Sequence, residues 1–142
     1  MNYPFTMKKL PLLVIFLFAI FLFSGATLFD NNNLVTNDVI THFKTGSSKE
    51  IARYFDQSVL LNINGTNGDY SKNQAEYILR DFFFKYPPVD FNVLHQAGSP
   101  GPTVFYVGSY QAKSEQFRVL IKGYSKTDAL RIYSIDIIKT KI

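Results

Sequence analysis

The sequence predicts an α+β domain in which helices pack on one side of an antiparallel sheet. Three observations support this fold class. Apolar residues recur every three to four positions between residues 33 and 85, they alternate every two positions between residues 89 and 139, and short turns join the alternating segments. Such turns make neighbouring strands antiparallel, because a parallel pair needs a crossover of about a dozen residues. Helices segregated to one side of such a sheet define the α+β class.

The first expected helix covers Asn33–Lys44. Its apolar residues Val35, Val39 and Phe43 recur every four positions, which places them on one face of a helix. Gly46 follows directly and suits the end of a helix.

A second, short helix is expected over Ser48–Phe55. Ser47 and Glu50 precede and open it with the spacing of a capping box, in which each side chain satisfies a backbone donor of the other residue. A strand is expected next over Ser58–Ile63, and it ends in the turn-rich stretch Asn62–Gly68.

The third helix has the clearest pattern. Ser71 and Gln74 form another capping box at its start. Pro87 and Pro88 end it, because proline lacks the backbone donor and its ring clashes with the preceding turn. Its continuous apolar stripe consists of Ala75, Ile78, Leu79, Phe82 and Phe83.

Four strands complete the chain. They are expected over Val89–Ala97, Thr103–Ala112, Gln116–Tyr124 and Leu130–Lys139. The element order is therefore α-α-β-α-β-β-β-β, with the last four strands forming a meander.

The apolar pattern of two of these strands indicates that both faces of the sheet are covered. Alternation places Phe105 and Val107 opposite Val104 and Tyr106, and it places Ile132 and Ile138 opposite Ile135 and Ile137. The helices can cover one face. A second subunit or a curled sheet edge could cover the other, so a homodimer through the sheet is one expectation.

The N-terminus predicts export. Lys8 and Lys9 precede Leu10–Phe23, a run of 14 residues without a charge, and the small residues Ser24-Gly25-Ala26 suit a cleavage site. Residues 1–26 therefore resemble a secretory signal peptide, with cleavage between Ala26 and Thr27. The predicted location is the periplasm or the extracellular space, and the chain meets the membrane only during export. The alternative is an uncleaved anchor, since residues 10–29 hold 20 positions without a charge.

The composition excludes several classes of function. The chain has no Cys, which rules out disulfides, Cys-based zinc sites and a thiol nucleophile. Its net charge of +4 falls to +2 without Lys8 and Lys9, so no strong basic field would attract nucleic acid. Its two histidines, His42 and His95, are not at metal-ligand spacing, and neither a metal nor a cofactor is expected.

Several segments together resemble a known family. They are Ala52-Arg53-Tyr54-Phe55-Asp56, Tyr70-Ser71-Lys72-Asn73-Gln74-Ala75-Glu76, Leu79-Arg80-Asp81-Phe82-Phe83, Pro87-Pro88, His95-Gln96, Tyr106-Val107-Gly108-Ser109 and Phe117-Arg118-Val119. The chain is similar here to small exported bacterial proteins with a nuclear-transport-factor-2-like fold, a curved sheet wrapped around helices into an open cone. The resemblance covers about residues 33–138. It implies this cone for the domain 33–142, and it implies no activity because the family is of unknown function.

His95 is the candidate functional residue. Alternation places it on one strand face with Phe91 and Val93, and with Tyr106 these residues would line the pocket of the cone. Histidine changes charge near neutral pH, which suits acid–base catalysis. The structural alternative is a histidine that is hydrogen-bonded to the backbone or to a tyrosine. Asp136 is the acidic residue considered as a partner for His95. The meander places its strand three strand spacings from that of His95, however, which is about 14 Å.

Two functions follow from these residues. The first is an exported, non-catalytic module that binds a small apolar ligand or a partner protein. The second is a small enzyme of the isomerase, dehydratase or hydrolase type, with His95 or a tyrosine as its acid–base group. The interior of the cone discriminates between them, because convergent titratable groups favour an enzyme and an apolar lining favours a binding module.

Overall fold

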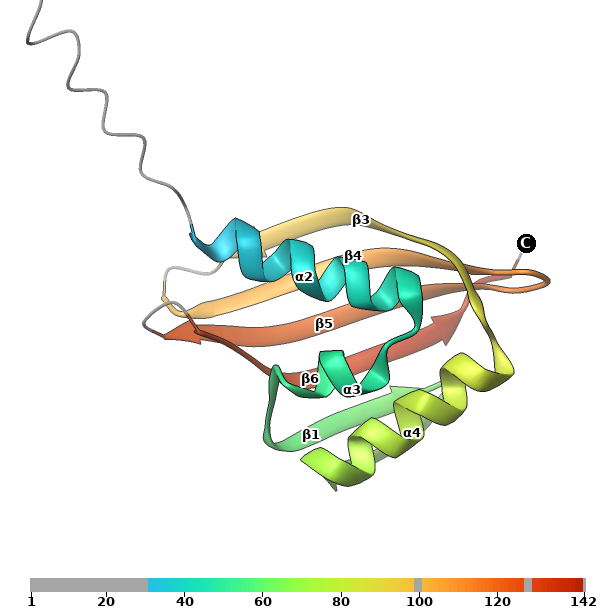
Figure 1. Cartoon of the computed structure of the whole chain (residues 1–142), viewed down its shortest axis with the longest axis horizontal. Coiled ribbons are helices and arrows are strands. Elements are labelled where there is room, and N and C mark those ends of the chain that lie inside the picture. Colours follow the sequence, from blue (N-terminus) through green and yellow to red (C-terminus); the bar gives the residue numbers. More distant parts are fainter. Residues whose placement is uncertain (1–30, 99–100, 127–128, 142) are drawn as a thin grey trace, which may run out of the picture.

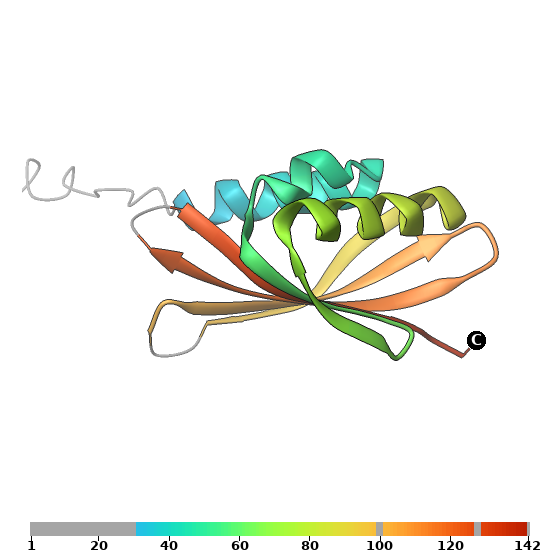
Figure 2. The same cartoon turned by 90° about the horizontal axis from the view of Figure 1, so that it is seen from below.

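The computed structural model describes residues 31–98, 101–126 and 129–141. The predicted signal segment and its cleavage position lie outside these residues. Three helices cover one face of a curved sheet, as Figures 1 and 2 show, so the predicted α+β class is confirmed. Among the described helices, none has both the length and the apolar character that crossing a membrane requires.

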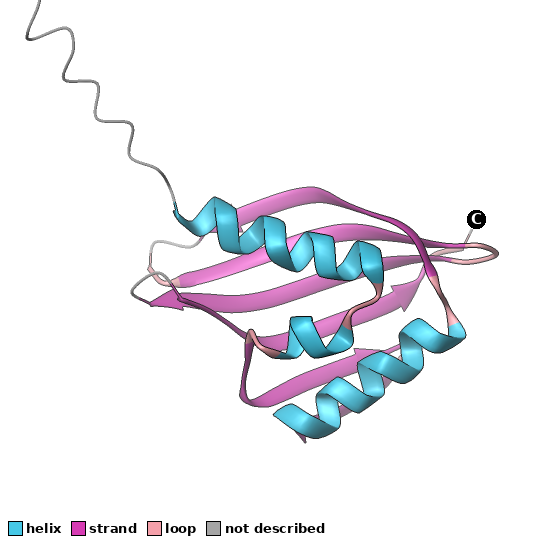
Figure 3. Ribbon diagram, in the orientation of Figure 1, coloured by secondary structure: helices cyan, strands magenta, loops and turns pink. Residues whose placement is uncertain are grey.

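Figure 3 distinguishes the helices from the strands by colour, and the labels of Figure 1 show that the order of strands in space differs from their order in the chain. The elements are α2 (Asn31–Thr45), α3 (Ser48–Ala52), β1 (Phe55–Ile63), β2 (Thr66–Ser71), α4 (Lys72–Lys85), β3 (Pro88–Gly98), β4 (Thr103–Ala112), β5 (Gln116–Lys126) and β6 (Ala129–Lys139). The sheet has the order β2-β1-β6-β5-β4-β3. The predicted meander of β3 to β6 is confirmed, but β6 also pairs in parallel with β1, so the sheet is mixed rather than wholly antiparallel.

Strand β2 was not expected from the sequence. It forms a hairpin with β1, and Ile63 pairs with Thr66 across the turn. Asn64 and Gly65 make this turn with φ angles of 53° and 91°, the positive values that a two-residue hairpin turn favours. The Asn-Gly pair is therefore the sequence signal for β2. The polar composition of the strand conceals it, because β2 lies at the sheet edge and most of its side chains are exposed.

One of the two predicted capping boxes exists. At the start of α4, the Ser71 hydroxyl accepts from the backbone N–H of Gln74, and the Gln74 side chain accepts from the backbone N–H of Ser71. The box at α3 is wrong, since Ser47 makes no capping hydrogen bond and Glu50 instead pairs with Arg53 at 3.2 Å. Helix α3 also ends at Ala52, before the expected boundary, because Phe55 already begins β1.

Cross-strand pairing defines two faces of the sheet. The helix face lies under the three helices and carries the buried residues Phe91, Tyr106, Tyr110, Phe117, Val119, Ile121, Ile135 and Ile137. The outer face lies opposite and carries Leu60, Asn62, His95, Phe105, Val107, Ser109, Arg118, Leu120, Lys122, Asp136 and Ile138. Directly opposed residues on neighbouring strands share a face, so each assignment follows from the register.

A bulge changes the predicted faces of β6. The register shifts between Lys122 and Gly123, which brings Ile132 to the helix face together with Ile135 and Ile137. All three isoleucines are fully buried there. The expectation that Ile132 opposes the other two is therefore wrong, because an extra residue in a bulge reverses the alternation that follows it.

The packing of α2 on the helix face depends on one close contact between β3 and β4. The Phe91 ring lies over Gly108, where an added Cβ would lie 2.4 Å from its Cζ. The same ring stacks on Phe43 of α2, with centroids 4.8 Å apart. Glycine at this position therefore lets the ring lie flat on the sheet and hold α2 against it.

We expect the substitution Gly108→Ala to destabilise the domain by about 1–3 kcal/mol, because the new methyl group forces the Phe91 ring out of its packing. Urea denaturation measures the free energy of unfolding. Gly98→Ala is the matched control, since no atom of the described residues lies within 4 Å of a Cβ at that position. Equal stability of the two variants would contradict this account of the β3–β4 contact.

Candidate functional site

The space between the helices and the sheet is occupied by aromatic rings. Phe82 lies edge-on to Phe117 at 5.1 Å, and Tyr86 lies 4.8 Å from the same ring. The full ring cluster consists of Phe43, Phe82, Phe83, Tyr86, Phe91, Tyr110 and Phe117. Burial of each such side chain stabilises the fold by about 1.5–3 kcal/mol. This part of the cone interior is therefore a packed core.

Tyr110 is a titratable member of the ring cluster. Its hydroxyl donates to the backbone carbonyl of Tyr86, where the chain leaves α4. Burial raises the pKa of Tyr110 well above its ordinary value, so the phenol stays protonated. A neutral phenol that already donates its proton to the backbone connects β4 to the end of α4. It offers no base for catalysis.

Three of the four predicted pocket residues lie on the helix face. Phe91 and Tyr106 are 1% and 5% exposed, and Val93 packs partly buried against the same core. These three belong to the packed interior. The structure therefore brings Phe91, Val93 and Tyr106 to one face but leaves His95 out of the group.

His95 lies on the outer face, opposite to the side that alternation predicts. The register of β3 shifts between Val93 and His95, so that His95 pairs with Val107 rather than continuing the row of Phe91 and Val93. Its side chain is exposed, and within the described part of the chain no hydrogen bond or ion pair engages it. The hydrogen bond from His95 to the backbone or to a tyrosine, which the structural alternative expects, is absent among the described residues.

The acidic residue considered as a partner for His95 has other contacts. Asp136 accepts a hydrogen bond from the Asn62 amide at 3.1 Å and pairs with Lys122 at 3.8 Å. It lies on β6, and β5 and β4 separate β6 from β3, as the meander predicts. His95 and Asp136 therefore do not form an acid–base pair.

A second polar contact, which the sequence did not reveal, joins β1 to β5. The Tyr124 hydroxyl donates to the Asp56 carboxylate at 2.6 Å. This bond, together with the backbone N–H of Gln57, lowers the pKa of Asp56. The same bond raises the pKa of Tyr124. Tyr133 stacks on Tyr124 at 6.2 Å, so the contact is a small polar and aromatic cluster at the surface.

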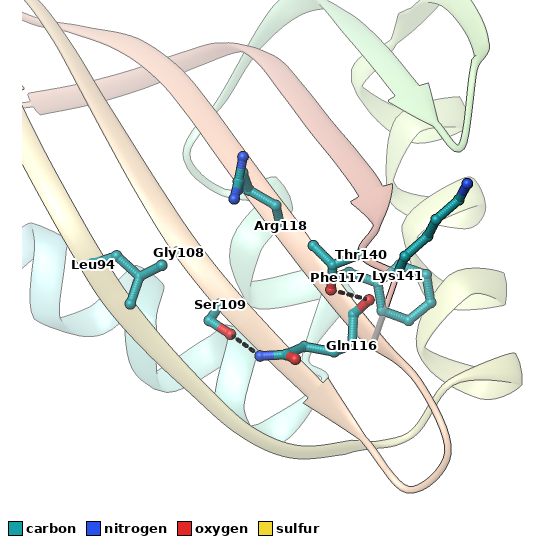
Figure 4. A pocket seen from close by; sticks show the side chains of 8 residues that line it. All are labelled: Leu94, Gly108, Ser109, Gln116, Phe117, Arg118, Thr140 and Lys141. Atoms are coloured by element: carbon teal, nitrogen blue, oxygen red, sulfur yellow. Dashed lines mark hydrogen bonds between the residues drawn. The ribbon is translucent and has the colours of Figure 1, made fainter.

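A hollow of about 220 Å³ opens beside the start of β5 (Figure 4). Its lining comes from β3, β4, β5 and the segment after β6: Leu94, Gly108, Ser109, Gln116, Phe117, Arg118, Thr140 and Lys141. The segment is held against β5, because the Thr140 backbone N–H and hydroxyl both donate to the Gln116 carbonyl, at 2.8 and 3.0 Å. Ser109 and Arg118 lie on the outer face, so the hollow opens on that face, although Phe117 of the ring cluster also contributes to its lining.

Sequence reasoning did not find this hollow. In the sequence, Arg118 is marked only by its place in the segment Phe117-Arg118-Val119, which resembles the family. No catalytic or ligand-binding motif includes Ser109, Gln116 or Lys141. They come together because β4, β5 and the segment after β6 are neighbours in space. Among the residues that the structure describes, no cluster of His, Asp and Glu could hold a metal ion.

Comparisons with known proteins place the chain among small domains of one family. The model of a family described as a domain of unknown function, DUF4783, matches residues 36–137. A crystal structure of a DUF4783 family protein from Bacteroides ovatus is 30% identical, with a TM-score of 0.70 over 74% of this chain and 94% of that one. Another, from Bacteroides uniformis, is 30% identical with a TM-score of 0.70, over 75% of this chain and 97% of that one.

A more distant structure bears on the fold alone. An NTF-2-like protein of unknown function from Silicibacter pomeroyi is 10% identical, with a TM-score of 0.55 over 78% of this chain and 93% of that one. The predicted nuclear-transport-factor-2-like fold is thereby confirmed. No curated protein matches the chain.

The exposed position of His95 predicts a small effect of its removal. We expect His95→Ala to change the free energy of unfolding by less than about 0.5 kcal/mol, as for most surface substitutions. Phe91→Ala, on the same strand but on the helix face, should cost about 3–5 kcal/mol. Urea denaturation compares the two variants. A loss above about 1 kcal/mol for His95→Ala would show that the residue has a structural partner.

The Tyr124–Asp56 bond predicts a pH-dependent contribution to stability. Since the pKa of folded Asp56 lies below its ordinary value of 3.8, the bond stabilises the fold above that pH and is lost as the pH falls through the lowered value. Since the pKa of Tyr124 lies above its ordinary value of 10.0, the contribution is complete below that pH and is lost as the pH rises through the raised value.

Urea denaturation of wild type and Tyr124→Phe, over a range of pH, tests this contribution. The difference in stability should be constant around neutral pH and should shrink in strong acid. Tyr133→Phe is the control, because it leaves the Tyr124 hydroxyl and Asp56 in place. A stability difference for Tyr124→Phe that does not vary with pH would exclude Asp56 as the titrating group.

Proposed function

Because the chain belongs to the DUF4783 family, a family of unknown function, we propose its role from its geometry: it is an exported, non-catalytic binding module. The ring cluster carries this proposal. Enzymes built on an open cone need titratable groups that converge on a cavity, whereas the described interior offers the neutral Tyr110, whose proton is already donated to the backbone. The binding surface is then the outer face of the sheet.

The outer face carries apolar side chains that the helices do not cover. Phe105, Val107 and Leu120 are half-buried neighbours at its centre, and Leu60 and Ile138 are 47% and 41% exposed. We propose a second copy of the chain as the occupant of this face. A net charge of +2 without residues 1–26 leaves little repulsion between two copies, and a symmetric contact sets the same apolar residues against each other.

Export is the second part of the proposal. It rests on the order of Lys8 and Lys9, the apolar run and Ser24-Gly25-Ala26. N-terminal sequencing of the protein from its host should begin at Thr27. Recovery of the full chain in the membrane fraction would support the uncleaved anchor instead. Native mass spectrometry of the same sample reports any carried ligand and the number of subunits.

Sedimentation velocity tests the proposed contact surface. The wild-type protein should form dimers at micromolar concentration. Val107→Glu should yield monomers, because it places a charge at the centre of the outer face. Phe84→Glu is the matched control, since Phe84 is 88% exposed on α4, on the side of the sheet that the helices cover. A wild-type protein that remains monomeric at every concentration would refute the sheet-mediated dimer.

A further inference from the structure

We propose that the hollow beside β5 binds one small anionic group, either a carboxylate or a phosphate. The proposal goes beyond the binding-module function and does not depend on a dimer. It rests on three features of the hollow: two cations at its rim without acidic partners, a hydroxyl with a proton to donate, and a volume suited to a single charged group.

The cations at the rim differ from those beside them. Lys122 pairs with Asp136 at 3.8 Å, and Lys139 pairs with Glu115 at 2.6 Å. Within the described part of the chain, the side chains of Arg118 and Lys141 have neither an ion pair nor a hydrogen bond. The two positive charges that border the hollow are thus left unneutralised, whereas their neighbours on β5 and β6 are paired.

Hydrogen-bond donors at the hollow also suit an anion. Ser109 Oγ accepts from the Gln116 side-chain amide at 2.9 Å, which leaves the hydroxyl proton of Ser109 for a ligand. The Thr140 hydroxyl already donates to the Gln116 carbonyl, so Thr140 positions Lys141 rather than binding the ligand. Arg118 offers a planar group that can donate two parallel hydrogen bonds to a carboxylate or a phosphate.

The size of the hollow limits what it can hold. Its volume of about 220 Å³ is below the roughly 300–1,000 Å³ of pockets that bury a drug-sized ligand. One acidic group fits, and the 64% exposed side chain of Leu94 offers an apolar wall to the carbon atoms attached to it. A small organic acid or a phosphate group therefore matches the hollow better than a large ligand.

Binding should be weak. Figure 4 shows the Arg118 and Lys141 side chains extending outward from the strands, with the Ser109–Gln116 hydrogen bond between Leu94 and Thr140. Both cations must turn toward the anion, and ordering such long side chains costs conformational entropy. We therefore expect a dissociation constant on the order of 1 mM.

Titration of the ¹⁵N-labelled protein with succinate and, separately, with inorganic phosphate tests the proposal by NMR. Chemical-shift changes should saturate and should be concentrated at Ser109, Arg118 and Lys141. Sodium chloride at matched ionic strength should produce no saturating chemical-shift change at these residues. Saturation by succinate alone would identify the ligand as a carboxylate, and saturation by phosphate alone would identify it as a phosphate.

Variants assign the binding to the hollow. Arg118→Gln should weaken binding about tenfold, because it removes a charge-assisted hydrogen bond, and Ser109→Ala should weaken it about threefold. Lys49→Gln is the matched control, since it makes the same change of charge on α3 and should leave affinity within about twofold of wild type. Affinities are compared only for variants whose amide spectrum remains that of a folded protein. Ser109→Ala leaves the net charge unchanged, so it tests the hollow independently of the charge removed in Arg118→Gln. Shifts that never saturate, or equal weakening by Arg118→Gln and Lys49→Gln, would overturn the proposal.

Discussion

The Phe91 ring takes the place that a side chain at position 108 would otherwise occupy, and the arrangement of the helices depends on that contact. The Phe91 ring of β3 packs on one side against Gly108 of β4 and on the other side against Phe43 of α2. Phe43 in turn lies edge-on to Phe83 at 5.8 Å, which brings α4 into the same cluster. One small residue on β4 thus allows four elements, β3, β4, α2 and α4, to share one core.

This packing has a direct bearing on function. An open cone can enclose a substrate only if part of its interior stays empty and carries a few well-placed polar groups. Here the described interior is occupied by rings, and the Tyr110 hydroxyl among them is committed to a backbone carbonyl. The apolar side chains that the helices leave uncovered lie on the opposite side of the sheet, where Phe105 and Leu120 alternate with charged neighbours.

Local chemistry explains which elements could be predicted from the sequence. Helix α4 is confirmed because its cap, its apolar stripe and its terminal prolines all act within a few residues of each other. Strand β2 was missed although Asn64-Gly65 marks its hairpin, because its polar side chains give no alternation. His95 and Ile132 were assigned to the wrong faces, since one extra residue in a bulge reverses the alternation across it. The hollow had no local signal at all, because its lining comes from segments that are distant in the sequence.

The place of β6 between β1 and β5 governs when the sheet can form. Asn62 and Asp136, which are partners on β1 and β6, are separated by 74 residues. Closing so long a loop is entropically costly, so this pairing forms late. Until then the β1–β2 hairpin and the β3–β5 meander present unpaired edges that attract other chains.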